Sequence, residues 1–199
     1  MTGGREIIHV FDFDGTLTHK DSFLELIRTK AGLSGLLLGL LRYSPWLVMM
    51  KLGLYANGKA KQRVFSHFFR NMSLADFTAL CNSMVGRYKE ILNPDVLKKL
   101  EEALGQGRRV FVVTASAAEW VRPFLPVHER LTIVATGLEV VDGRLTGRFS
   151  TPNCYGAEKV RRLKALLTQP REHYHIVAYG DSRGDREMFS YVDESVVVK

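Results

Sequence analysis

The chain has 199 residues, of which 46% are hydrophobic and 25% are charged. This composition is typical of an ordinary globular protein, and it excludes a disordered chain, a collagen and a coiled coil. Lysine and arginine number 28 against 21 acidic residues, a formal net charge of +7. This excess favours anionic partners, which are phosphate esters, acidic lipid surfaces or nucleic acid, without choosing between them.

Cysteine content and the first residues bear on the cellular compartment. Cys81 and Cys154 are far apart in the sequence, and no second pair of metal ligands lies near either of them. We expect two reduced thiols. The segment from Met1 to Glu6 leads directly into a strand pattern, without the apolar stretch and cleavage site of a signal peptide. We therefore expect a cytoplasmic protein.

Five short apolar runs predict the strands of a parallel sheet. They occupy residues 7–11, 109–114, 132–136, 175–179 and 195–198. Helical patterns separate several of them, at residues 95–104, 117–125, 157–167 and 185–191. Near-continuous apolar strands that alternate with helices indicate an α/β fold whose parallel sheet is covered on both faces.

Two further segments complete the predicted architecture. The Asp142-Gly143 pair between residues 138–141 and 144–147 predicts a β-hairpin, because this pair supplies the positive φ angles of a two-residue turn. Residues 19–99 contain no convincing strand and are predicted to be helices inserted between the first two strands. We expect residues 1–18 and 100–199 to form the α/β core and residues 19–99 to form a helical cap over the carboxyl ends of the strands.

An unusual leucine-rich stretch runs from Leu33 to Tyr55. Arg42, Pro45 and Lys51 interrupt it, and a proline ends or kinks a helix. One interpretation is a helix pair that packs on itself and on the core. A second is a surface that dips into a bilayer or holds an acyl chain. A membrane span is the third, although a span needs about 20 consecutive apolar residues.

The strongest chemical signal is the pair Asp12 and Asp14 at the end of the first predicted strand. Side chains two residues apart at a strand end point the same way, so both should reach the crevice where open α/β sheets bind ligands. Adjacent carboxylates repel unless they share a cation, and Mg²⁺ prefers such oxygen ligands. A calcium loop fits poorly, because Leu17 and Phe23 stand where that loop needs Gly and Glu.

A second pair of carboxylates follows the fourth predicted strand. Asp181 stands at the strand end as Asp12 does, and Asp185 lies four residues later. Helix capping explains Ser182 and Asp185 equally well by themselves. Four acidic side chains at the ends of two strands are hard to explain as capping alone, so we predict a shared metal site.

Polar groups suited to a phosphate lie near these carboxylates. Thr114 ends the second predicted strand and is followed by Ala115-Ser116, and Lys159 begins a helix. A hydroxyl with free N–H groups can bind phosphate oxygens, and a lysine can neutralise their charge. Taken singly, the residues after the second predicted strand are equally well a helix cap, and Lys159 is equally well a solvated surface lysine. Together they allow one aspartate to attack phosphorus and another to move the protons of the leaving group and of water.

The residues Asp12-Phe13-Asp14-Gly15-Thr16, Thr114, Lys159 and Gly180-Asp181-Ser182, with Asp185, resemble the four ordered motifs of the haloacid dehalogenase superfamily of phosphatases. The helical insertion resembles the cap of the phosphoserine-phosphatase-like branch. The leucine-rich cap, the Asp14-Gly15-Thr16-Leu17 run with Asp21, and residues 154–159 also resemble the bacterial type C phosphatidylglycerophosphate phosphatases. The resemblance covers the whole chain and implies a Rossmann-like core with an inserted helical cap.

This resemblance implies a role for each matched residue. Asp12 would be the nucleophile and a metal ligand, and Asp14 the general acid and base and a metal ligand through its backbone carbonyl. Asp181 would ligate the metal and Asp185 would support the metal site. Thr114 would bind the phosphoryl group and Lys159 would orient the nucleophile. Further substrate-binding or phosphate-binding candidates are Gly15, Thr16, Ala115, Ser116, Asp21 and Arg63.

Several of these candidates depart from the phosphoserine phosphatase pattern. Asp21 stands where a Glu meets the substrate amine, and Ala115-Ser116 replaces a Gly-Gly pair. Arg63 is a candidate for the arginine of the cap. The departures weaken the assignment to phosphoserine itself and leave the substrate open between a small soluble phosphomonoester and a lipid phosphate.

The predicted function is a Mg²⁺-dependent phosphomonoester hydrolase that works through a phosphoaspartate. Its substrate would be a phosphoserine-like small molecule or a lipid phosphate such as phosphatidylglycerophosphate, with peripheral contact to an anionic inner membrane face left open. A non-catalytic phosphate-binding protein on the same fold is the alternative. A nucleic-acid binder using Lys59, Lys61 and Arg63 ranks lower, because no recognition motif accompanies them. The oligomeric state is not predicted.

Overall fold

The computed structural model describes residues 4–198; Met1 to Gly3, in the segment where no signal peptide is expected, lie outside the described residues. Its central sheet has five parallel strands in the order β3-β2-β1-β6-β7. These are β1 (Glu6–Phe11), β2 (Arg109–Ala117), β3 (Leu131–Thr136), β6 (Tyr174–Gly180) and β7 (Glu194–Val197). The central strand, β1, sets Phe11 opposite Val112 of β2 and Tyr179 of β6.

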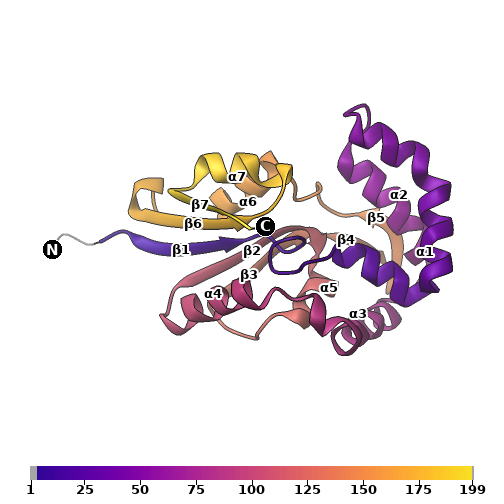
Figure 1. The fold of residues 1–199 in the computed structure, drawn as a ribbon, viewed down its shortest axis with the longest axis horizontal. Coiled ribbons are helices and arrows are strands. Elements are labelled where there is room, and N and C mark those ends of the chain that lie inside the picture. The colour runs from indigo at the N-terminus through magenta and orange to yellow at the C-terminus, as the bar shows by residue number, and fades with distance from the viewer. Residues whose placement is uncertain (1–3, 199) are drawn as a thin grey trace.

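Helices cover both faces of this sheet (Figure 1). Along β1, Val10 packs with the buried cluster that contains Leu163 of α6 (Ala157–Leu166) and Met188 of α7 (Arg186–Tyr191). The next residue, Phe11, packs with the cluster on the other face, which includes side chains of α4 (Pro94–Gly105) and α5 (Ala118–Val121). Alternate side chains of a strand that is buried on both sides therefore form two separate cores. The predicted fold class is confirmed.

One helix on this side is shorter than the sequence pattern predicts. The expected helix over 117–125 consists of α5 and a 3₁₀ turn over Arg122–Phe124, and the strand before it runs on to Ala117. Pro123 lies in the 3₁₀ turn. A proline cannot donate the backbone hydrogen bond that a longer helix would need at this point.

The predicted hairpin is confirmed. It pairs β4 (Leu138–Val141) with β5 (Arg144–Phe149) in antiparallel register. Asp142 and Gly143 both have positive φ angles, 49° and 72°. This is the backbone conformation that a two-residue turn needs.

The long insertion between β1 and β2 is helical, as predicted. It contains α1 (Ser22–Lys51), α2 (Asn57–Phe69), α3 (Leu74–Tyr88) and a 3₁₀ turn over Lys89–Ile91. These helices gather beyond the carboxyl ends of the strands, and α2 packs against β5 (Figure 1). The expected division after residue 99 falls inside α4, which packs against β1 and β2.

The course of α1 differs from the expectation at Pro45. The helix continues through Pro45, and its break lies at Gly32, where φ is +70°. Pro45 cannot donate to the carbonyl of Leu41, but the hydroxyl of Ser44 donates to that carbonyl at 2.8 Å. The acceptor that the proline leaves free is thus satisfied within the helix.

The interpretation of residues 33–55 as a helix pair packed on the core accounts for only part of α1. Gly39 is buried against Phe68 of α2. By contrast, Leu37, Leu38 and Leu41 are more than half exposed. By length and composition α1 is also apolar enough to cross a bilayer, with a mean hydropathy of 1.3 in its most apolar window.

Candidate active site

Carboxylates converge at the carboxyl ends of the two central strands. Asp12 follows β1, Asp181 follows β6, and Asp185 ends the 3₁₀ turn over Arg183–Asp185. One carboxylate oxygen from each of the three lies within 4.8 Å of the others. The loop after β1 approaches closely at Gly15, where an added Cβ would lie 2.3 Å from Oδ2 of Asp181. With its φ of +79°, this position requires glycine.

Lys159 lies at the centre of the carboxylates. It comes from the first turn of α6, its side chain is almost fully buried, and its Nζ lies 2.7 Å from Oδ1 of Asp12 and 2.7 Å from Oδ1 of Asp185. Burial raises the pKa of Asp12 to about 7, although Lys159 acts to lower it. Burial would lower the pKa of Lys159, but the two aspartates raise it above its usual value. The lysine therefore stays charged and holds Asp12 in place.

The donor set fits a hard divalent cation. Both oxygens of Asp185 are engaged, one by Lys159 and the other by the backbone N–H and hydroxyl of Ser182. Partial burial and the nearby Asp185 both raise the pKa of Asp181, and no other side chain of residues 4–198 forms a hydrogen bond or ion pair with its carboxylate. Three carboxylates around one lysine leave excess negative charge, and oxygen ligands of this kind suit Mg²⁺. Asp12 and Asp181 are thus free to ligate, whereas Asp185 is held as a support.

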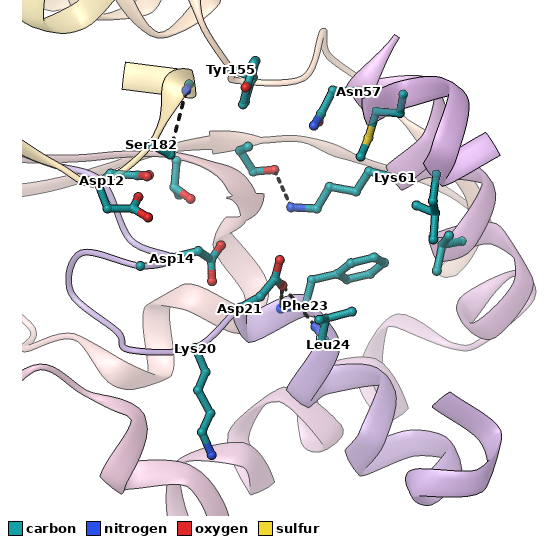
Figure 2. Close-up of a pocket in the computed structure, with 18 of the residues that line it drawn as sticks. Asp12, Asp14, Lys20, Asp21, Phe23, Leu24, Asn57, Lys61, Tyr155 and Ser182 are labelled. Atoms are coloured by element: carbon teal, nitrogen blue, oxygen red, sulfur yellow. Dashed lines mark hydrogen bonds between the residues drawn. The ribbon is translucent and has the colours of Figure 1, made fainter. Parts of the chain in front are cut away.

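Asp14 is fixed by two hydrogen bonds. The backbone N–H of Ser22 donates to its Oδ1 at 2.7 Å, and the hydroxyl of Ser116 donates to its Oδ2 at 2.5 Å. Lys61 of α2 in turn donates to the Ser116 hydroxyl oxygen at 3.3 Å and to the carbonyl of Ala115 at 3.2 Å. Figure 2 shows Asp12 and Asp14 on one side of the pocket and Lys61 reaching toward them from the other.

Thr114 and Thr16 differ in their position relative to the pocket. Thr114 lines the pocket, and its hydroxyl accepts a hydrogen bond from the N–H of Ser116 at 3.0 Å. Thr16 is fully buried, does not line the pocket, and its hydroxyl has no hydrogen-bond partner among the described residues. Gly15 and Ala115 line the pocket as well.

The structure does not bring Arg63 to this pocket. Its Nε donates to the hydroxyl of Tyr55 at 2.7 Å, and its guanidinium lies over the ring of Trp46. Lys61, two residues earlier, occupies the pocket instead. One feature of the sequence indicates that Lys61 faces inward. The buried Val64 and Phe65 lie three and four residues after it, on the same face of α2.

Asp21 has a local structural role at the pocket's edge. One of its oxygens accepts hydrogen bonds from the N–H groups of Phe23 and Leu24 and so caps α1. Burial and the nearby Asp14 raise its pKa, and Lys61 lowers it. Asp21 lines the pocket beside Lys61 and faces whatever occupies it.

The outer wall of the pocket is apolar. The cavity has a volume of about 440 Å³ and extends from the carboxylates to the helices of the insertion. The side chains of this wall are Phe23, Leu24, Leu40, Leu47, Met50 and Val64. Leu40 and Leu47 belong to the leucine-rich stretch, but only the packing of α1 shows which leucines of that stretch face the cavity.

Residues 9–190 match the model of the haloacid dehalogenase-like hydrolases. The chain belongs to this family. Protein CicA of Caulobacter vibrioides is 32% identical over 199 residues, which cover 98% of this chain and 88% of CicA.

Solved structures agree on the fold. A Bordetella pertussis protein of unknown function superposes with a TM-score of 0.82 at 18% identity, covering 97% of this chain and 90% of its own. A phosphoserine phosphatase, solved as an analogue of its phospho-aspartyl intermediate, has a TM-score of 0.61 at 20% identity, covering 98% and 87%. The family and the fold class predicted from the sequence are confirmed, and the chain is a haloacid dehalogenase-like hydrolase.

Proposed function

We propose that this enzyme hydrolyses phosphate monoesters with Mg²⁺ and forms a phosphoaspartate on Asp12. The observation that carries the proposal is the convergence of Asp12, Asp14 and Asp181 on Lys159 and Thr114 in one pocket. A structural relative, a phosphoserine phosphatase, has been solved as an analogue of such an intermediate. We also propose that α1 to α3 act as a cap over this pocket.

The residues divide the chemistry between them. Asp12 attacks phosphorus, and Asp14 protonates the leaving oxygen and later takes a proton from the incoming water. Thr114 and the neighbouring backbone N–H groups hold phosphoryl oxygens, and Lys159 keeps the nucleophile aligned. Bound Mg²⁺ would neutralise charge on the phosphoryl group. Asp12, Asp181 and the carbonyl of Asp14 would hold the ion, with Asp185 in support.

The apolar wall of the pocket favours a substrate whose alcohol part is amphiphilic. A lipid phosphate such as phosphatidylglycerophosphate would set its phosphate among the carboxylates and its apolar part against Leu40, Leu47 and Met50. A phosphoserine-like substrate is the second candidate, because Asp21 could meet its amine. We propose a cytoplasmic enzyme that acts at the inner face of an anionic membrane.

Turnover of p-nitrophenyl phosphate with Mg²⁺, and with a chelator in its place, tests the proposed activity. We expect hydrolysis only with the metal, and a loss of at least about 10³-fold in Asp12→Asn, because the amide cannot form the intermediate. Asp95→Asn, an exposed substitution on α4, is the matched control and should match the parent. Equal rates in Asp12→Asn and the parent would show that Asp12 is not the nucleophile. No turnover of any phosphate ester would favour a phosphate-binding protein.

A further inference from the structure

The positive charge of the protein is concentrated in one part of the chain. Residues 22–70, which comprise α1 and α2 and are called here the basic hairpin, contain eight lysines and arginines and a single acidic residue, Glu25. Their net charge of +7 equals that of the whole chain, so the remaining residues are neutral in sum. Figure 1 shows that α1 forms the outer edge of the molecule, at the end away from the N-terminus.

The basic hairpin also carries an exposed apolar stripe. We call this stripe the leucine face; between half and three quarters of each of its side chains is exposed, and its members are Leu33, Leu37, Leu38, Leu41, Val48 and Leu52. At 100° per residue, the first five of these side chains lie within an arc of about 140° on α1, and Leu52 follows the last turn of the helix. The basic side chains of Arg42 and Lys51 are also exposed on this helix. A contiguous apolar patch of this kind marks an interaction site.

The leucine face lies next to the pocket. Leu40 and Leu47, which line the cavity, alternate along α1 with Leu41 and Val48 of the leucine face. At 100° per residue the two sets occupy neighbouring sides of one helix. Whatever covers the leucine face therefore borders the apolar wall of the active-site pocket.

We infer that the leucine face and its flanking basic side chains dock on the surface of an anionic bilayer, with α1 lying in the interface. Apolar side chains that enter the acyl boundary while lysine and arginine meet acidic headgroups are the features that such binding requires. A second copy of this chain fits less well, because two hairpins of +7 would repel each other. Nucleic acid would bind the basic side chains but would leave the leucine face uncovered.

A transmembrane position of α1 is disfavoured by its packing. Phe23, Leu26 and Ile27 in its first turns are buried in the core of the protein, and Gly39 is packed against Phe68 of α2. Crossing the bilayer would detach α1 from these contacts and from the pocket that it lines. Docking in the interface leaves them intact.

Vesicle flotation tests the inference. The full chain is mixed with vesicles of phosphatidylcholine alone or with about one third phosphatidylglycerol, an anionic lipid. We expect flotation with the mixed vesicles only, and release in high salt. Leu37→Asp/Leu41→Asp/Val48→Asp should lower partitioning by at least about tenfold. Arg42→Glu/Lys51→Glu should lower it by about 25-fold, at about fivefold for each basic side chain.

Two controls separate binding from folding. Val127→Asp changes a fully exposed valine before β3, outside the basic hairpin, and Lys98→Glu/Arg130→Glu reverses two charges that also lie outside it. Both should float like the parent, and thermal unfolding followed by circular dichroism should be unchanged in all variants. The vesicle lipids are phosphodiesters and the assay contains no phosphate monoester, so a failure to float is distinguishable from a failure of the proposed catalysis. The inference rests on the proposed function only for the choice of substrate.

Several results would overturn the inference. They are equal flotation with both vesicle types, binding that survives the three aspartates, and a membrane fraction that resists both salt and alkaline carbonate, as a spanning helix would. A dimer in sedimentation equilibrium that Leu37→Asp dissociates would show that a second copy covers the leucine face instead.

Discussion

The hydroxyl of Ser116 joins Lys61 of α2 to Asp14, the proposed acid and base. It donates a 2.5 Å hydrogen bond to Oδ2 of Asp14, and its oxygen lies 3.3 Å from Nζ of Lys61 on α2. Ser116 does not line the pocket, so it acts on the reaction through Asp14. We regard it as a positioning residue, which holds the carboxyl group toward the leaving oxygen.

Ser116→Ala should therefore matter most when the leaving group needs a proton. We expect kcat to fall about tenfold for an alkyl phosphate and less than about twofold for p-nitrophenyl phosphate, whose leaving group departs unprotonated. KM should be unchanged, and Ser116→Thr should restore activity. Ser83→Ala, on the exposed side of α3, is the control. An equal loss on both esters would contradict a positioning role.

Lys61→Met should weaken substrate binding. Its ammonium lies in the pocket beside Asp21 and over the rings of Phe23 and Trp120. We expect KM for the preferred substrate to rise about tenfold, or about 1.4 kcal/mol, and Lys61→Arg to recover most of it. Lys59→Met, exposed on the same helix, should leave KM unchanged. Steady-state kinetics would refute this role if Lys59→Met and Lys61→Met had equal effects.

Mg²⁺ should stabilise the fold through Asp181. At about 100 times its dissociation constant a ligand adds about 2.7 kcal/mol, which should raise the melting temperature by about 5 °C or more in a chain of this size. Asp181 is exposed, so Asp181→Asn should fold normally but lose the shift. Asp142→Asn, at the turn between β4 and β5, should keep the rise in melting temperature with Mg²⁺. Thermal unfolding with and without Mg²⁺ decides the matter, and a full shift in Asp181→Asn would exclude this carboxylate as a ligand.

Lys159→Met should destabilise the metal-free protein. The substitution leaves the buried carboxylates of Asp12 and Asp185 without their shared cation. Breaking a buried ion pair from one side costs about 3–5 kcal/mol, and urea unfolding without Mg²⁺ should show a loss of this size. Lys98→Met, at an exposed position of α4, should change stability by less than about 0.5 kcal/mol. A loss below about 1 kcal/mol in Lys159→Met would show that the cluster does not depend on this lysine.

Asp193 should make stability depend on pH in the acid range. Burial would raise the pKa of Asp193, but hydrogen bonds from the N–H of Ile176 and from Arg171 and Arg5 lower it to about 2. Because the folded pKa lies below the ordinary value of 3.8, the carboxylate stabilises the fold above about pH 4. This contribution is lost as the pH falls toward 2.

Asp193→Asn removes that titration. Urea unfolding should show the variant less stable at pH 7 by about 1–2 kcal/mol and closer to the parent at pH 2. Asp95→Asn, whose side chain is exposed, should run parallel to the parent at every pH. A constant difference between Asp193→Asn and the parent from pH 7 to pH 2 would contradict the lowered pKa.

Much of the core of the candidate site was predictable. Asp12 and Asp181 end apolar runs that become neighbouring parallel strands, and the carboxyl ends of such strands always meet at one edge of a sheet. The Asp142-Gly143 turn was equally readable, since few residue pairs accept two positive φ angles. These features depend on local backbone preferences and on strand polarity, which the order of residues already contains.

The helical insertion could not be predicted in the same detail. Lys61 and Arg63 are both basic and two residues apart, yet only the packing of α2 decides that Lys61 enters the pocket and Arg63 turns to Tyr55. The hydroxyl of Ser44 satisfies the carbonyl that Pro45 leaves free in α1, and the contact of Ser116 with Asp14 joins residues 102 positions apart. Each depends on which face of a helix meets another element.

The sequence by itself thus determined the α/β core, the hairpin and the acidic residues at the strand ends, because periodicity and turn chemistry act over a few residues. Tertiary structure alone decided which leucines of α1 line the pocket and which stay exposed. A helix that is apolar on several sides has no single buried face in its pattern, and only the elements packed against it select one.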